Sequence, residues 1–190
     1  GEIPRVPILV DSPMAITTTE LYERRSQDHR LDPAVCSAAF ACAGYAREVE
    51  ESKAIDRRED PLVVISASGM ATGGRVVHHL KHFAPNPANT ILLAGFQAAG
   101  TRGAALAGGA AAIKIHGQYV PVRAEVARID SLSAHADQRE LLAWLGAGPR
   151  PREIYLVHGE PEARDALRLK ISEQLGWECN IPDYRETVAL

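Results

Sequence analysis

The sequence has few cysteines and no long apolar run. Only three cysteines occur among 190 residues, and none of them forms a CxxC pair, so the sequence signals neither a disulfide framework nor a cysteine-bound zinc site. A reducing, cytoplasmic compartment fits this pattern. No stretch of about 18 apolar residues is present, which predicts that the chain has no transmembrane helix and no membrane partner.

Lysine is also scarce. The 21 basic residues comprise 17 arginines and four lysines, against 24 acidic residues. The net charge of −3 excludes a uniformly basic nucleic-acid binder, but it leaves room for a local basic cleft. Arginine binds phosphate through paired hydrogen bonds, although a GC-rich genome is the simpler explanation of the arginine bias.

Short apolar runs alternate with amphipathic segments along the chain. Strands are expected at residues 6–10, 62–65, 90–94, 153–157 and 177–181, helices at 14–27, 48–59, 76–83, 137–145 and 161–175, and a hairpin from 111–115 and 119–129. Residues 36–46 fit either a helix or a packed loop. The alternation predicts an α/β fold, a mostly parallel Rossmann-like sheet with helices on both faces.

Two glycine-rich loops follow the strands expected at 62–65 and 90–94. Ligands bind at the carboxyl ends of such strands, where glycines let backbone N–H groups approach a phosphate. The alternative is a tight turn that requires glycine, and a small-nucleotide site is poorly supported because neither GKS, GKT nor GxGxxG occurs. The candidate phosphate-binding residues are Ser66, Ser68, Gly69, Thr72, Gly73, Arg75, Gln97, Gly100, Thr101 and Arg102.

Two further loops carry a histidine with a carboxylate two residues later. These pairs are His135 with Asp137 and His158 with Glu160. A histidine in such a place can bind a metal or move a proton, while the carboxylate orients it. A catalytic zinc needs about three protein ligands, so the spacing also fits ordinary structural histidines.

The remaining histidines carry a weaker signal. His78 and His82 lie four residues apart on the expected helix 76–83, so they share one of its faces. With His79 and Lys81 beside them, a solvated basic face is the interpretation that we favour. His116 is expected to be structural, at the turn of the hairpin.

Taken in order, the unusual loops resemble one family, the β-CASP branch of the metallo-β-lactamase superfamily. Its members are metal-dependent nucleases that process RNA and, in some cases, DNA. The matching segments span nearly the whole chain and keep the family's order: Asp11-Ser12-Pro13-Met14-Ala15, Ser68-Gly69-Met70 with Gly73-Gly74-Arg75 and His79-Leu80, Gly100-Thr101-Arg102-Gly103, Ser133-Ala134-His135-Ala136-Asp137, and Val157-His158-Gly159-Glu160.

The resemblance implies a zinc-dependent phosphodiesterase that cleaves RNA, as an endonuclease or a 5′-exonuclease. By this resemblance His158 binds one zinc ion of a two-zinc centre, and His135 is the general acid for the leaving oxygen. A pair of metal ions would activate the attacking hydroxide, and histidine suits proton donation near neutral pH. Relatives often carry another arginine where this chain has Ala104 after Gly103.

The family's principal zinc motif, HxHxDH, is absent, because no two of the seven histidines are separated by one residue. We therefore expect the chain to be the C-terminal part of a longer enzyme that lacks the N-terminal metallo-β-lactamase lobe. Residues 1–130 would be a partial β-CASP lobe, and residues 131–190 the returning segment of an αββα metallo-β-lactamase lobe.

Such a fragment is expected to be inactive alone. It would expose apolar surface at residues 154–157 and form a homodimer. The alternative function is a non-catalytic RNA- or phosphate-binding module that uses the glycine-rich loops and needs neither His135 nor His158.

Overall fold

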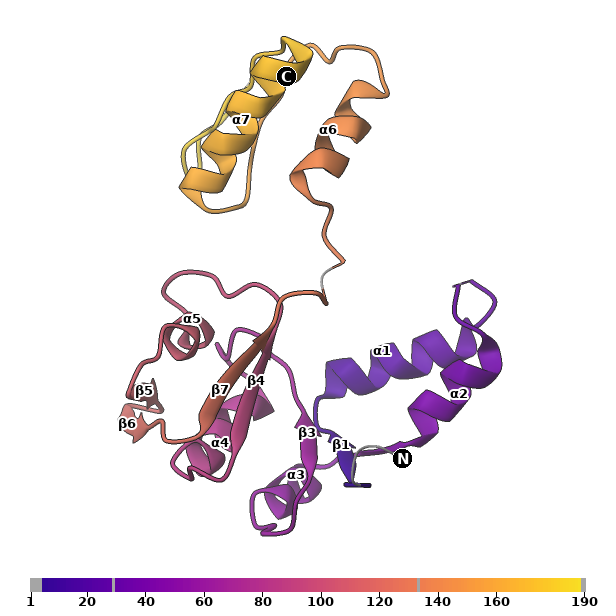
Figure 1. Ribbon diagram of the computed structural model, residues 1–190, viewed down its shortest axis with the longest axis vertical. Helices are drawn as coiled ribbons and strands as arrows, with labels where there is room; N and C mark the ends of the chain where they lie inside the picture. The colour runs from indigo at the N-terminus through magenta and orange to yellow at the C-terminus, as the bar shows by residue number, and fades with distance from the viewer. Residues whose placement is uncertain (1–4, 29, 133, 189–190) are drawn as a thin grey trace. The chain divides into compact units, whose positions relative to one another are not determined.

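The computed structural model describes residues 5–28, 30–132 and 134–188, and the chain divides into two compact units, residues 1–132 and 133–190 (Figure 1). The first unit contains β1 (Ile8–Val10), α1 (Pro13–Arg24), α2 (Pro33–Ala41), β2 (Ala43–Tyr45), α3 (Val49–Ile55), β3 (Val63–Ile65), α4 (Arg75–Phe83), β4 (Thr90–Ala94), α5 (Arg102–Ala107), β5 (Ala112–Ile115), β6 (Gln118–Pro121) and β7 (Glu125–Ile129). The second contains α6 (Gln138–Gly146) and α7 (Pro161–Leu175).

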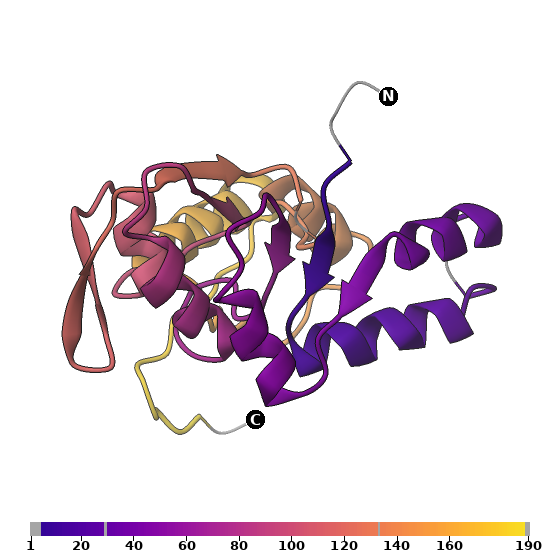
Figure 2. The same ribbon diagram turned by 90° about the horizontal axis from the view of Figure 1, so that it is seen from below.

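Parallel pairing dominates the first unit and confirms the predicted α/β fold. Strand β1 lies between β2 and β3 and pairs in parallel with both, while β4 pairs in parallel with β7. Strands β5 and β6 form the antiparallel hairpin that the sequence predicts. Helices α1 and α2 lie side by side in both views (Figure 2).

The expected strand 119–129 is wrong as a single element, because it is interrupted between β6 and β7. The last bond of the hairpin ladder is the one that Val122 N–H donates to the Ala111 oxygen, at 2.9 Å. The backbone N–H groups of Arg123 and Ala124 turn to the carbonyl oxygen of Ala84, at 2.8 and 3.0 Å. The chain thereby leaves the hairpin and joins β4 as a parallel neighbour.

The ambiguous segment 36–46 contains parts of two elements. Helix α2 ends at Ala41, and the three-residue strand β2 follows it directly and pairs with β1. Strand β2 has the sequence Ala-Gly-Tyr, which lacks the β-branched run typical of strands, so the sequence pattern could not reveal it.

Helix α7 agrees with its expected range, but the strands expected around it do not form as such. Pro161 begins the helix, and Gly176 ends it in the left-handed conformation with φ 66°. The segments 153–157 and 177–181 contribute a single parallel bridge, in which Leu156 N–H donates to the Asn180 oxygen and Asn180 N–H donates to the Ile154 oxygen, each at 2.8 Å. Val157 is exposed, whereas Ile154, Tyr155 and Leu156 are partly buried, so the expected exposure of the segment 154–157 stays a prediction.

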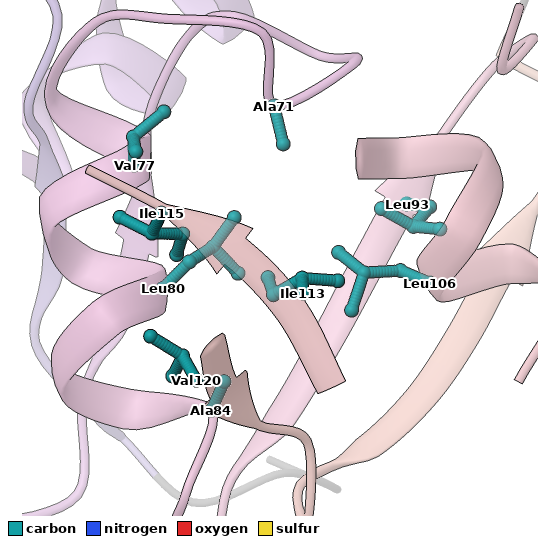
Figure 3. Close-up of a cluster of buried hydrophobic side chains, with 9 residues drawn as sticks. All are labelled: Ala71, Val77, Leu80, Ala84, Leu93, Leu106, Ile113, Ile115 and Val120. Carbon is teal, nitrogen blue, oxygen red and sulfur yellow. The ribbon is translucent and has the colours of Figure 1, made fainter. Parts of the chain in front are cut away.

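One apolar cluster packs helices α4 and α5 against β4 and the hairpin. Its nine buried members are shown in Figure 3: Ala71, Val77, Leu80, Ala84, Leu93, Leu106, Ile113, Ile115 and Val120. Leu93 of β4 points into this cluster, whereas Leu92 on the same strand is 56% exposed. Val63 and Ile65 of β3 are also exposed, so the predicted helical cover on both faces does not extend to these side chains.

A fully buried carboxylate, Asp11, joins four elements of the first unit. It follows β1, and its Oδ1 accepts a hydrogen bond from Arg75 of α4 at 2.5 Å. Its Oδ2 accepts from Ser52 of α3 at 2.5 Å and lies 2.7 Å from Nε2 of His79 of α4. Its backbone N–H donates to the Ile65 oxygen at the end of β3. Because breaking such a buried pair leaves a charge uncompensated, this carboxylate is a structural anchor.

The interpretation of His79 as part of a solvated basic face is wrong. Its side chain is buried, with one ring nitrogen facing Asp11 and the other facing Asp56. His78 and His82, its neighbours on α4, are exposed. The two faces of this helix therefore use histidine in different ways.

No helix in the described part of the chain is both long enough and apolar enough to cross a membrane.

Leu106→Ala tests the core. We expect it to lower the free energy of unfolding by about 2–5 kcal/mol, because Leu106 is fully buried and its truncation leaves a cavity. Leu92→Ala, on an exposed position of β4, is the matched control and should change it by about 0.5 kcal/mol or less. Urea denaturation followed by circular dichroism measures both. Equal effects would contradict the assignment of the core.

Asp11→Asn tests the anchor. Burial raises the pKa of Asp11, but hydrogen bonds from Ser52, Arg75 and His79 outweigh burial and hold it below its ordinary value of 3.8. A lowered carboxyl pKa contributes stability that is present above the pKa of the unfolded chain and is lost as pH falls through the folded pKa. The wild type should therefore lose stability on acidification below about pH 4, with a smaller loss in Asp11→Asn.

At neutral pH, Asp11→Asn should cost about 3 kcal/mol, because Arg75 and His79 lose their shared anion. The control is Asp130→Asn, which removes an exposed carboxylate paired with Arg128 and should cost less than about 1 kcal/mol. Urea titrations at several pH values measure both variants. Parallel pH profiles for the wild type and Asp11→Asn would refute the anchor.

Candidate nucleic-acid interface

The carboxyl ends of β1, β3 and β4 carry the loops that the sequence singles out. Asp11 follows β1, residues 66–74 follow β3, and residues 95–101 follow β4. Strands β1 and β3 belong to one parallel sheet and β4 to another, and ligands bind at the carboxyl ends of strands in such sheets. The two glycine-rich loops therefore lie where a phosphate site is expected.

Residues 66–74 form a tight loop that depends on one glycine. Gly74 has φ 76°, and a Cβ atom built on it would lie 2.8 Å from the Ala67 carbonyl oxygen. This position therefore requires glycine for its conformation and for the close backbone contact. Across the loop, the hydroxyl oxygens of Ser68 and Thr72 lie 3.0 Å apart, so two of the candidate phosphate-binding side chains are brought together.

Arg75, another candidate phosphate-binding residue, is held by partners within the chain. Its Nη1 donates to Asp11 and to the Ala46 carbonyl oxygen at 2.8 Å, and its Nη2 donates to the Arg47 carbonyl oxygen at 2.8 Å. The side chain is 18% exposed. These bonds hold the start of α4 against the residues that follow β1 and β2. A phosphate contact by Arg75 stays a prediction.

Ser66 has a similar internal role at the other end of this loop. Its hydroxyl donates to the backbone oxygen of Asp11 at 2.8 Å. Ser66 and Arg75 thus tie both ends of the loop to Asp11.

Arg102 joins the two glycine-rich loops. Its Nε donates to the Lys114 oxygen at 2.5 Å, and its Nη1 donates to the carbonyl oxygens of Ala71 and Thr72 at 3.0 and 3.3 Å. The next residue adds a second link, since Gly103 N–H donates to the Met70 oxygen at 3.0 Å. The loops therefore form one continuous surface of the first unit.

Gln97 and Thr101 support the second loop. The Thr101 hydroxyl accepts from Ala104 N–H at the start of α5 and donates to the Ala98 oxygen, which is a typical helix cap. The Gln97 amide nitrogen donates to the Gly95 oxygen at 3.4 Å. Its buried Oε1 lies 1.7 Å from the position of a Cβ atom built on Gly103, so a side chain at residue 103 would displace the Gln97 amide.

Two candidate glycines are not explained by the chain's own packing. A Cβ atom built on Gly69 or Gly73 meets no described atom within 4 Å, and neither residue has the positive φ that favours glycine. Gly100 also has space around it, but its φ of 79° accounts for its identity. The backbone at 69 and 73 is therefore open to approach from outside.

His135 lies in the second unit, just before α6, and is exposed. Asp137 was expected to orient this histidine, and in the structure it caps α6. Its Oδ1 accepts a hydrogen bond from Glu140 N–H at 2.8 Å, and its own N–H donates to the Glu140 carboxylate. This reciprocal capping box fixes the start of the helix. Ser133, the first residue of the same segment, lies outside the described residues.

His158 is also exposed and belongs to the second unit. Its φ of 64° is uncommon for a residue with a side chain, and Gly159 follows with φ 125°. Glu160 then takes the N-cap position of α7. This sharp turn presents the histidine between the bridge at Tyr155 and the start of the helix.

The described side chains do not complete a zinc site. Within these residues, no group of three or more histidine, cysteine, aspartate or glutamate side chains converges closely enough to hold a metal ion. A catalytic zinc takes about three protein ligands and an open position. His158 can therefore supply at most one ligand of such a site.

Sequence analysis missed one network of this region, which consists of the buried residues Asp11, Ser52 and His79 and the partly buried Asp56. One local signal was available, because Arg75 and His79 are four residues apart and so share a face of α4. Their acidic partners are remote, since His79 lies 68 positions from Asp11 and 23 from Asp56. No periodic pattern reports contacts of that kind.

Comparison with protein families identifies both parts of the chain. Residues 1–106 match the Beta-Casp domain, and residues 119–182 match the Zn-dependent metallo-hydrolase RNA specificity domain. The first match alone covers more than half of the chain.

Curated relatives agree with these domains. The chain is 39% identical to a protein named as a ribonuclease of Thermus thermophilus, over 98% of this chain and 44% of the relative. It is 35% identical to a transcription termination factor of Pyrococcus abyssi, over 76% and 23%, and 31% identical to an RNase J-like protein of Methanocaldococcus jannaschii, over 84% and 37%. The chain spans less than half the length of these relatives. With both domain matches in the family's order, the chain belongs to the β-CASP family of the metallo-β-lactamase superfamily.

Proposed function

We propose that this chain carries the phosphate-binding surface and the proton donor of a ribonuclease, an RNA-cleaving hydrolase. The substrate is RNA, whose phosphates contact the joined glycine-rich loops of residues 66–74 and 95–101. The named relatives include a ribonuclease and an RNase J-like protein, which supports RNA over a small nucleotide.

The observation that carries the proposal is the open backbone at Gly69 and Gly73. Neither position needs glycine for its backbone conformation or for packing against described residues. Close approach of a ligand to the backbone is a further reason for glycine, and backbone N–H groups in a tight loop are good phosphate donors. The paired hydroxyls of Ser68 and Thr72 on the same loop add further donors.

In the proposed reaction, His135 donates a proton to the oxygen that leaves the scissile phosphate. Proton donation stabilises the departing alkoxide, and imidazole has an ordinary pKa suited to this role near neutral pH. The exposed position of His135 ahead of α6 leaves it accessible to a substrate, and the capping box at Asp137 fixes the helix that follows.

His158 is proposed as one ligand of a zinc centre in the full-length protein. The match of residues 119–182 to a Zn-dependent domain supports this assignment. The other ligands would come from polypeptide beyond these 190 residues. Bound zinc would supply the activated water for hydrolysis, and the chain alone is then expected to bind RNA without cutting it.

Gly73→Ala tests the phosphate surface. The added methyl group has space in the free protein, so the free energy of unfolding should stay level or rise by up to about 1 kcal/mol. The same methyl group would obstruct a phosphate at the backbone, so RNA affinity should fall about tenfold, equivalent to about 1.4 kcal/mol. Fluorescence anisotropy with a labelled single-stranded RNA measures the affinity.

Gly148→Ala is the matched control, because Gly148 also has nothing near its built Cβ atom and lacks a positive φ. It should leave RNA affinity unchanged. Wild-type binding should weaken steeply as salt rises, because phosphate contacts release counterions. Unchanged binding by Gly73→Ala would remove this loop from the interface.

Substitution of the two histidines separates binding from cleavage. In the full-length protein, His135→Ala should slow RNA cleavage by about 10²–10⁴-fold, the usual contribution of a general acid, while RNA affinity stays near that of the wild type. His158→Ala should lower the zinc content measured by atomic emission and abolish cleavage. If both variants cut RNA normally, neither histidine takes part in catalysis, and the proposed contribution of this chain is reduced to RNA binding.

A further inference from the structure

His79 lies between two carboxylates in the interior of the first unit. Its Nε2 is 2.7 Å from Oδ2 of Asp11, and its Nδ1 is 2.6 Å from Oδ1 of Asp56. The histidine is 5% exposed and Asp11 is fully buried. Both distances are those of hydrogen bonds, so both ring nitrogens are used.

These contacts select one protonation form of the ring. A neutral imidazole has a single N–H group and a lone pair on its other nitrogen. With both carboxylates ionised, that lone pair would face a carboxylate oxygen at hydrogen-bond distance. The imidazolium form, in contrast, donates to both.

The charges around the ring agree with the imidazolium form. The charged groups in contact with this network are Asp11 after β1, Asp56 at the end of α3, and Arg75 at the start of α4. Two carboxylates and one guanidinium leave one negative charge, which a protonated His79 cancels. Buried charges are tolerated when they are paired in this way.

The network around His79 is connected directly to the loop of residues 66–74, which is proposed to bind phosphate. Residues 66–74 begin at Ser66, whose hydroxyl bonds to the Asp11 backbone oxygen, and end before Arg75, whose guanidinium bonds to the Asp11 carboxylate. His79 lies one helical turn after Arg75 and holds the other oxygen of the same carboxylate. Both ends of the loop therefore depend on one residue that His79 helps to hold.

We propose that His79 in its doubly protonated form is a positioning residue for RNA binding, holding Asp11 and hence both ends of the loop 66–74. The inference rests on the proposed role of that loop in phosphate contact. His79 itself does not touch RNA. Loss of its proton removes one of its two bonds to the carboxylates, loosens the loop and weakens RNA binding.

Nuclear magnetic resonance of the ¹⁵N-labelled chain tests the protonation form without RNA. At pH 6.5 both ring nitrogens of His79 should resonate as protonated nitrogens. As pH rises, the backbone amides of Gly69, Thr72 and Gly73 should shift with the same midpoint as the ring. A ring with one unprotonated nitrogen at pH 6.5, or loop amides that ignore its titration, would overturn the proposal.

RNA affinity of the Asp56→Asn variant supplies the second readout. This change keeps an oxygen acceptor for Nδ1 but removes the charge that favours the imidazolium. At pH 8 the variant should bind RNA about tenfold more weakly than the wild type, a usual size for coupling between linked sites, and at pH 6 the two should agree within about twofold.

The control is Asp60→Asn, which removes an exposed carboxylate paired with Arg58 and should match the wild type at both pH values. Equal loss of affinity by Asp56→Asn at pH 6 and pH 8 would indicate a purely structural role and refute positioning by the proton. If the wild type binds no RNA at either pH, the proposed function fails. The loop amides then decide the role of His79 by themselves.

Discussion

The arrangement of the first unit depends on one buried carboxylate. Asp11 is fully removed from solvent, where an unpaired charge would be strongly unfavourable, so each element around it has to supply a partner. Ser52 comes from α3, Arg75 and His79 come from α4, and the backbone of Asp11 pairs with the end of β3. A single requirement for charge compensation thus holds two helices, α3 and α4, against the parallel strands. It also determines the ends of the loop proposed to meet RNA.

Arginine in a glycine-rich loop first suggests phosphate binding, but the two arginines of this region bind groups within the chain. Arg75 and Arg102 donate to five backbone oxygens and one carboxylate within the chain. Arg102 still adds positive potential to the loop edge, because all its acceptors are neutral carbonyl oxygens, whereas the charge of Arg75 is paired with Asp11. Their rigidity also lowers the entropy lost on binding, which preserves affinity. The proposed interface therefore combines fixed charge with an open glycine backbone.

Sequence patterns predicted the elements whose signals are local. The strand at Thr90–Ala94 is a continuous apolar run, and helix α7 is delimited by Pro161 and Gly176. Strand β2 was missed because it is three residues long and exists only through its pairing with β1. The interpretation of His79 failed because its partners are remote in sequence, and its neighbours His78 and His82 do face solvent. For the candidate site, the pattern predicted the loops, whereas the bonds that join them through Arg102 and Gly103 have no signal in the sequence.

The position of the β5–β6 hairpin has a consequence for how the chain folds. Strand β7 pairs with β4 across an intervening segment that contains α5 and this hairpin. Joining distant strands costs loop-closure entropy and makes folding slow. A hairpin closes within about 1–10 μs, and in doing so it returns the chain to Ala111, to which Val122 is bonded just before β7 begins. The closed hairpin shortens the distance between β7 and β4, so the antiparallel part of the unit assists a parallel pairing between residues that are 35 positions apart in the sequence.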